Sequence, residues 1–445
     1  RGSAPAQINV PRDYWTQVVD IELPPIVRFE RQGGGKDAID KAAKLLSEAK
    51  FPVILSGAGV VIGDAIDDCK KLAEKLDAPV CNGYQHNDSF PGSHPLAVGP
   101  LGYNGSKAAM ELISKADVVL ALGTRLNPFS TLPGYGIDYW PKNATIIQVD
   151  MNPDRIGLTK KVTVGICGDA KMVSQQILEK LTSNAGDNGR EDRKNLIHQT
   201  KSAWLQTLTS LDHEDDDPGT VWNKEARERD SDRMSPRQAW RAIQAGMPED
   251  VIISSDIGNN CAIGNAYPTF EKPRKYLAPG LFGPCGYGFP SILGAKIGCP
   301  DTPVIGFAGD GAFGISMNEM SSCAREEWPA ITMVIFRNYQ WGAEKRNSIL
   351  WFDDNFVGTE LDPELSYAKV ANACGLKGIT AKTMDETTKA IKQSCEDQKK
   401  GITTFIEVVL NQELGEPFRR DAMKKPVKVA GINKDDMRPQ KSLVS

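Results

Sequence analysis

Short apolar runs alternate with amphipathic stretches along most of the chain, and this alternation predicts two domains built on parallel sheets. In the first domain, apolar runs at residues 51–55, 118–122 and 145–149 predict buried strands, with another near Val80. Periodic apolar positions predict helices over residues 36–49, 64–76, 106–115 and 170–181. Strands that alternate with helices in this way form doubly wound α/β sheets.

The second half of the chain repeats the same alternation. Apolar runs predict four more strands, at residues 251–255, 302–308, 331–336 and 403–410. Pro236 directly after Ser235 is typical of a helix start. Helices are predicted over residues 236–245, 289–297, 313–327, 363–374 and 385–399. The expected fold class is therefore α/β, with two doubly wound parallel-sheet domains.

Charge, proline and glycine content set the expected domain limits. We expect a central Rossmann-like domain over residues 36–183, a charged linker with a solvated helix over 184–233, and a second domain over 234–412. Residues 1–35 begin with arginine rather than methionine, continue through a strand-like stretch at residues 6–11, and end in a triple glycine. We interpret them as the tail of a preceding domain and its linker. The proline-containing, basic residues 413–445 predict either a disordered tail or a lid over a site.

Composition excludes some functions and leaves others open. Hydrophobic content of 40% and charged content of 25% are ordinary for a soluble globular protein. A net charge of −4 provides no general attraction to nucleic acid or to an anionic membrane, and no apolar run has the length of a membrane span. Nine cysteines without metal-type spacing indicate reduced thiols in the cytoplasm, and four histidines form no zinc motif.

Candidate metal-binding residues lie where two predicted neighbouring strands end. Asp310, between two glycines, follows the strand at residues 302–308, and Asn338 follows the strand at 331–336. One crossover helix between parallel strands brings both side chains to the carboxyl edge of the sheet, where open α/β sheets bind ligands. Their oxygens suit Mg²⁺, and the glycines let the backbone approach a phosphate. A lone Gly-Asp-Gly is more often a tight turn, so the prediction depends on this context.

This arrangement resembles the diphosphate anchor of thiamine-diphosphate (ThDP) enzymes, although Arg337-Asn338 stands where that family usually has Asn-Asn. Residues 123–125, 148–150 and 283–290 fit the same family. The chain is similar to the latter two-thirds of a ThDP enzyme of the acetolactate-synthase and pyruvate-oxidase type. That resemblance implies a pyrimidine-binding domain that precedes Arg1 and carries the activating glutamate, so no catalytic residue is named here. It also implies an active site between subunits, hence a homodimer or homotetramer.

The resemblance also implies the site residues of this chain. Asp310 and Asn338 are expected to bind Mg²⁺ by side chain, and Gln340 through its carbonyl. The aminopyrimidine is expected to contact the backbone of Gly283 and Cys285, and we find no adjacent base that would make Cys285 a nucleophile. The full set expected to bind ThDP is Gly258, Asn259, Asn260, Gly283, Cys285, Gly309, Asp310, Gly311, Ala312 and Asn338.

Five passages resemble one branch of this family, the acetyltransferases that act on sulfoacetaldehyde in sulfonate degradation. They are residues 11–17, 99–105, 127–136, 340–346 and 416–425. The resemblance implies conversion of sulfoacetaldehyde and phosphate to acetyl phosphate and sulfite. Lys345 and Arg346 are expected to bind a substrate anion, unless they form a solvated basic surface.

Other interpretations stay open. The chain could use pyruvate, as acetolactate synthase or pyruvate oxidase does with FAD in the central domain, or bind ThDP without catalysis. The Gly57-x-Gly59 turn lacks the third glycine of a dinucleotide fingerprint, so we expect a structural Rossmann-like layer there. Arg125 is either structural or part of the cleft.

Overall fold

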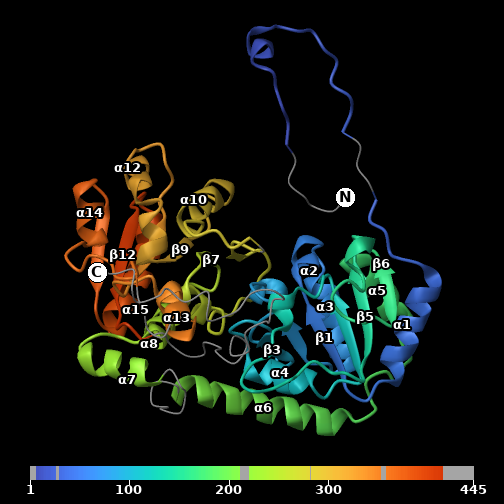
Figure 1. Cartoon of the computed structure of the whole chain (residues 1–445). Coiled ribbons are helices and arrows are strands. Elements are labelled where there is room, and N and C mark those ends of the chain that lie inside the picture. Colours follow the sequence, from blue (N-terminus) through green and yellow to red (C-terminus); the bar gives the residue numbers. More distant parts are fainter. Residues whose placement is uncertain (1–6, 27–29, 211–219, 281, 352–356, 414–445) are drawn as a thin grey trace, which may run out of the picture.

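Two α/β bodies lie side by side in the computed structural model, which describes residues 7–26, 30–210, 220–280, 282–351 and 357–413 (Figure 1). Each contains a six-stranded sheet, and every neighbouring pair of named strands is parallel. The expected α/β fold class is confirmed. No helix in these described ranges is long and apolar enough to cross a membrane.

The first sheet has the strand order β3-β2-β1-β4-β5-β6. Its strands are β1 Pro52–Ser56, β2 Val80–Asn82, β3 Ala97–Pro100, β4 Val118–Leu122, β5 Thr145–Asp150 and β6 Val164–Cys167. Its helices are α1 Lys36–Glu48, α2 Ala58–Ile62, α3 Ile66–Leu76, α4 Lys107–Ile113 and α5 Ala170–Lys180. Every residue of β1 and β4 is buried, which explains their continuous apolar sequences.

The second sheet has the order β11-β12-β10-β9-β7-β8. Its strands are β7 Ile252–Ser255, β8 Tyr276–Leu277, β9 Val304–Gly309, β10 Thr332–Arg337, β11 Lys377–Ala381 and β12 Thr404–Val409. The helices are α8 Pro236–Gly246, α9 Asn259–Gly264, α10 Gly288–Gly298, α11 Asp310–Gly314, α12 Met320–Cys323, α13 Gly342–Trp351, α14 Tyr367–Ala373 and α15 Met384–Gln398. Strands β9 and β10 are direct neighbours, with Phe336 opposite Gly309, as the sequence predicts.

Two predicted helices are shorter than expected. The helix predicted over residues 313–327 is broken into α11, a 3-10 turn at Met317–Glu319 and α12, because Gly314 and Ser316 are weak helix formers. The helix predicted from residue 363 begins only at Tyr367, where Ser366 caps it by accepting a hydrogen bond from the Lys369 amide.

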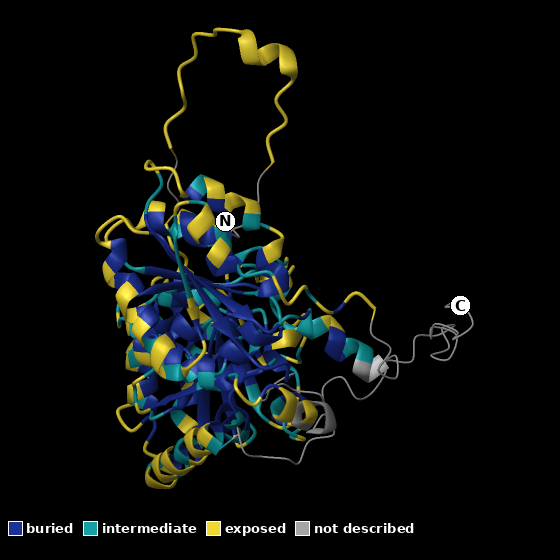
Figure 2. Cartoon of the chain, turned by 90° about the vertical axis from the view of Figure 1, so that its left-hand side faces the viewer, coloured by how far each residue is buried: buried dark blue, intermediate teal, exposed yellow. Residues whose placement is uncertain are grey.

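The segment before the first sheet is not a strand. Among its described residues, 7–11 have no regular structure and Arg12–Thr16 form a 3-10 helix. Without a neighbouring strand the backbone has no ladder partner, and apolar side chains such as Trp15 and Val18 are exposed (Figure 2).

The segment between the two bodies is more firmly attached than a solvated linker. It forms α6 Arg190–Ser210 and α7 Thr220–Arg229, which follow one another below both sheets in Figure 1. Trp204 and Leu208 of α6 are buried against Ala108 of α4. The Arg193 side chain is also buried, and its guanidinium donates to five backbone carbonyls, those of Lys50, Leu76, Asp77, Gly186 and Asn188. The tail predicted as a lid or as disordered lies outside the described residues from 414 onward.

Candidate functional site

A narrow pocket of about 40 Å³ lies at the carboxyl ends of β7, β9 and β10. Four stretches line it, namely Ile257 to Asn260, Cys285, Gly309 to Ala312, and Asn338 with Gln340 to Glu344. The pocket therefore collects nine of the ten residues expected to bind a cofactor, and all three expected metal ligands. The tenth, Gly283, is next to it, because a Cβ at Gly283 would contact Ile257 at 3.6 Å.

Asp310 is the most constrained group in this pocket. Its Oδ2 accepts hydrogen bonds from Arg337 Nη1 at 3.0 Å and from the Tyr339 amide at 2.6 Å. Its Oδ1 accepts one from the Gly311 amide at 3.0 Å. Burial raises the pKa of Asp310 to about 6, although the nearby Arg337 guanidinium acts to lower it. Oδ1 accepts one hydrogen bond from the described residues and so keeps capacity for a further bond.

Three residues that line the pocket with Asp310 carry buried amide atoms without partners. Asn338 Nδ2, Gln340 Oε1 and Asn260 Oδ1 have no hydrogen-bond partner among the described residues. Leaving a buried polar group unpaired costs about 1–3 kcal/mol, so three in one pocket indicate a site built for a polar ligand. Carboxylate and amide oxygens at this position fit a hard divalent cation.

The glycines leave room for that ligand. Gly258 has φ +135°, and a Cβ at Gly258 or at Gly309 would meet no atom within 4 Å. The backbone at these two positions is open to the pocket and can approach a phosphate closely. Gly311 is glycine for another reason, since its Cβ would lie 2.7 Å from the Trp341 ring. Trp341 also lines the pocket, and the sequence interpretation did not include it.

Asp256 is a second residue that the sequence interpretation missed. It lies just beyond β7, and its carboxylate accepts hydrogen bonds from the amides of Ile257 (2.7 Å), Gly286 (3.0 Å) and Gly288 (2.6 Å). These bonds tie the loop of Gly283 and Cys285 to the loop of Gly258. Burial raises the pKa of Asp256. A buried acidic residue that closes a loop has no distinctive sequence signal.

Cys285 has the environment of a neutral thiol. Burial raises its pKa, and the carboxylates of Asp256 and Glu344 raise it further. A cysteine that acts as a nucleophile needs a lowered pKa, so this environment argues against that role.

Lys345 and Arg346 are buried, so they do not form a solvated basic surface. Lys345 Nζ forms an ion pair with Glu360, and burial lowers the pKa of Lys345. Arg346 Nη1 lies 3.3 Å from the Tyr103 hydroxyl, which belongs to the first body. Both side chains lie on α13 beside the pocket, but neither is among its lining residues.

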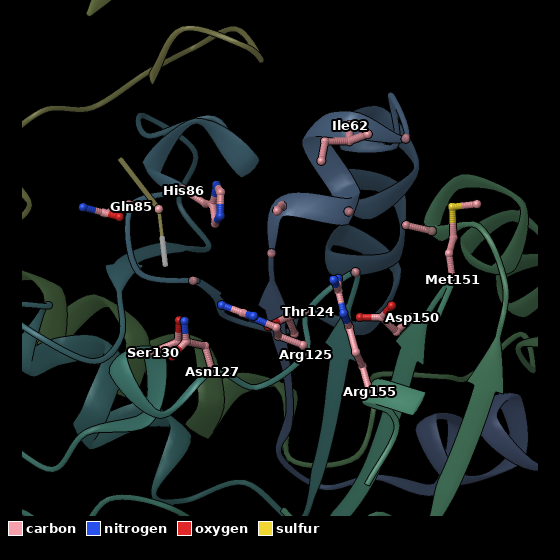
Figure 3. A pocket seen from close by; sticks show the side chains of 18 of the residues that line it. Ile62, Gln85, His86, Thr124, Arg125, Asn127, Ser130, Asp150, Met151 and Arg155 are labelled. Atoms are coloured by element: carbon pink, nitrogen blue, oxygen red, sulfur yellow. The ribbon is translucent and has the colours of Figure 1, made fainter. Parts of the chain in front are cut away.

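A separate cavity of about 530 Å³ lies at the carboxyl edge of the first sheet (Figure 3). Arg125 lines it, together with Arg155 and His86, so Arg125 does not belong to the pocket of Asp310. Burial, together with the nearby Arg125, lowers the pKa of His86 to about 4, so the imidazole is neutral at pH 7. Gly123 has φ +61°, and its Cβ would lie 2.7 Å from Gly59, which explains the glycines of both loops.

Two protein-family models match the chain, one in each of its two α/β bodies. The model described as "Thiamine pyrophosphate enzyme, central domain" matches residues 39–181. The model described as "Thiamine pyrophosphate enzyme, C-terminal TPP binding domain" matches residues 256–408, which include every residue that lines the narrow pocket.

Similar proteins agree with these matches. The chain is 77% identical over 443 residues to a probable sulfoacetaldehyde acetyltransferase of Rhizobium meliloti, covering 100% of this chain and 75% of that protein. It is 73% identical over 440 residues to the sulfoacetaldehyde acetyltransferase of Roseovarius nubinhibens, covering 99% and 73%. The crystal structure of benzoylformate decarboxylase from Polynucleobacter necessarius has a TM-score of 0.68 at 19% identity, covering 91% of this chain and 70% of that one. This last likeness concerns the fold alone.

Proposed function

The chain belongs to the thiamine pyrophosphate enzymes and, among them, to the sulfoacetaldehyde acetyltransferases, and from this premise we propose how its site operates. It is a ThDP-dependent acetyltransferase that acts on sulfoacetaldehyde. We propose phosphate as the second substrate, Mg²⁺ as the metal, and acetyl phosphate and sulfite as the products. The observation that carries the proposal is the pocket that joins Asp310 to Asn260, Asn338 and Gln340, each of which has one unpartnered buried amide atom.

Asp310 and Asn338 hold the cation by their side chains, and Gln340 holds it by its backbone carbonyl. The neighbouring ends of β9 and β10 support this assignment, as does the free capacity of Asp310 Oδ1. The diphosphate binds between two loops, one from Gly258 to Asn260 and the other from Gly309 to Ala312. The Gly311 amide already donates a hydrogen bond to Asp310 Oδ1. If this amide binds phosphate, its hydrogen bond to the carboxylate must weaken.

The remaining residues orient the cofactor and its surroundings. Gly283 and Cys285 contact the aminopyrimidine through the backbone, on the loop that Asp256 fixes. When bound, ThDP supplies the carbanion chemistry that breaks the bond between carbon and sulfonate sulfur. The protein provides position and fixed charge around the narrow pocket. We assign proton abstraction from the cofactor to none of the described residues.

Two anions, a sulfonate and a phosphate, must be bound near this pocket. We propose Arg346 and Lys345 for this role, because both are buried cations on α13 directly after pocket residue Glu344. Glu360 partly neutralises Lys345. We also propose a homodimer or homotetramer in the cytoplasm, where reduced cysteines are expected; none of the nine, all within the described ranges, forms a disulfide.

The test supplies the protein with ThDP, Mg²⁺, phosphate and sulfoacetaldehyde, and measures sulfite and acetyl phosphate. We expect equal amounts of the two products, and no acetyl phosphate when either substrate is omitted. Turnover of pyruvate without sulfite release, or a flavin absorbance in the purified protein, would favour an enzyme of the acetolactate-synthase or pyruvate-oxidase type instead. Binding of ThDP without any turnover would favour a non-catalytic protein.

A further inference from the structure

Arg337 is the last residue of β10 and stands directly before the proposed metal ligand Asn338. Its side chain is 1% exposed, as is that of Asp310, with which it forms an ion pair at 3.0 Å. A buried arginine cannot lose its proton, so this charge is permanently fixed beside the carboxylate.

The ion pair determines which oxygen of Asp310 remains available. Oδ2 receives two hydrogen bonds, from Arg337 Nη1 and from the Tyr339 amide. Oδ1 receives one, from the adjacent Gly311 amide. Each carboxylate oxygen has about two acceptor positions, so Oδ1 retains the one that can bind a cation.

The guanidinium group is itself held by several contacts, although its Nε has no hydrogen-bond partner among the described residues. Nη2 donates to the carbonyls of Asp362 and Leu365, the second at 2.9 Å. The rings of Tyr339 and Tyr367 lie against it, with centroids 4.1 and 5.5 Å away. Glu407 Oε1 lies 3.6 Å from Nε. The planar guanidinium group of arginine, with its donors in a fixed geometry, can make all of these contacts at once. The ammonium group of lysine cannot reproduce them.

We infer that Arg337 is a positioning residue, which fixes the Asp310 carboxylate so that Oδ1 faces the cation. This inference rests on the proposed function, because it requires Asp310 to be a metal ligand. Arg337 touches neither the pocket nor a substrate, and it acts only through the carboxylate. Groups that orient metal ligands in this way commonly contribute about 10–100-fold to metal affinity.

The experiment uses Mn²⁺ as a probe for Mg²⁺ in the presence of ThDP, and measures unbound Mn²⁺ by electron paramagnetic resonance. The variants are Arg337→Lys, which keeps the charge, and Arg337→Gln, which keeps a donor. The matched control is Arg233→Gln. Arg233 also lies over the Tyr339 ring, at 4.9 Å, but it pairs with Asp230 and Asp232 instead of Asp310.

We expect both Arg337 variants to bind Mn²⁺ at least about tenfold more weakly than the wild type, and the control to bind it normally. Circular dichroism reports whether each variant is folded. A purely structural role would lower the thermal midpoint without changing the Mn²⁺ affinity of the folded protein. Wild-type affinity, or tighter binding, in a folded Arg337 variant would therefore overturn the inference.

A milder variant covers the case in which both substitutions prevent folding. Glu407→Gln keeps Arg337 but removes the carboxylate 3.6 Å from its Nε, so the guanidinium that holds Asp310 is less firmly fixed. We expect Mn²⁺ to bind a few times more weakly, and unchanged affinity would again overturn the inference. Failure of the wild type to bind Mn²⁺ with ThDP would instead overturn the proposed function, and the inference with it.

Discussion

At the scale of single residues, Asp310 is the group on which the proposed site depends. Its burial, its partners and the single bond that Oδ1 accepts from the described residues can be seen only in the folded chain. The sequence nevertheless identified the residue, because Gly-Asp-Gly at the end of an apolar run has few alternative explanations once Asn338 follows the next strand. Trp341 and Asp256 could not be found in this way. Their roles come from loops that meet only through tertiary structure.

Replacing Asp310 should separate cofactor binding from folding. In Asp310→Ala we expect Mg²⁺-dependent ThDP binding to fall by about 100-fold or more, because the site loses the charged group that we propose as a metal ligand. We expect the fold to persist with reduced stability, since Arg337 loses one of its two buried carboxylate neighbours. Titration calorimetry with ThDP and Mg²⁺ measures the affinity, and Asp385→Ala, an exposed aspartate on α15, is the control. Unchanged affinity in Asp310→Ala would contradict the metal assignment.

At the scale of elements, the sequence predicted those strands and helices that are long or continuously apolar. Strands β1, β4, β9, β10 and β12 were recognised because both of their faces are buried. The edge strands β3, β6, β8 and β11 were all missed. Strand β3 is short and contains glycine and proline, β6 has buried residues only at alternate positions, β8 has two residues, and most of β11 is only partly buried. Helix α13 was missed because its sequence has no amphipathic period.

Helix α6 gives a prediction about the segment expected to be a linker. Arg193→Ala removes the donors of five backbone carbonyls and should destabilise the protein by about 2–4 kcal/mol. Lys194→Ala, at the exposed next position, should change stability by less than about 0.5 kcal/mol. Urea unfolding of both variants measures the difference. Equal stability of the two variants would mean that α6 is as loosely attached as the sequence suggested.

At the scale of the whole molecule, a short loop of the first body docks on the second. Asn87 Nδ2 donates to the carbonyls of Asn265 and Pro268, at 2.9 and 3.1 Å. Asp88 Oδ2 accepts hydrogen bonds from the amides of Lys275 and Tyr276, at 3.0 and 3.3 Å. These contacts join residues far apart in the sequence, and no local pattern predicts them. They fix the two sheets relative to each other.

Asp88 should make stability depend on pH. Burial raises its pKa to about 6, from an ordinary value of 3.8. The folded state therefore binds a proton more tightly than the unfolded chain, so this group lowers stability as pH rises from about 4 to about 6. Asp88→Asn keeps an acceptor for the two amides without a buried charge. At pH 7 we expect it to be more stable than the wild type by up to about 3 kcal/mol, with the gain absent at pH 4. Thermal unfolding across this range measures it, and a destabilised variant at pH 7 would contradict it.

The contact between Trp341 and Gly311 has a practical consequence. The indole lines the pocket proposed for the diphosphate, so a molecule that enters will replace solvent next to the ring. Indole emission is sensitive to such a change, and the protein contains only eight tryptophans in which to look for it. Subtracting the fluorescence of Trp341→Phe isolates the signal of this single ring. The fold thus carries its own optical reporter of occupancy, readable in real time and without any attached dye.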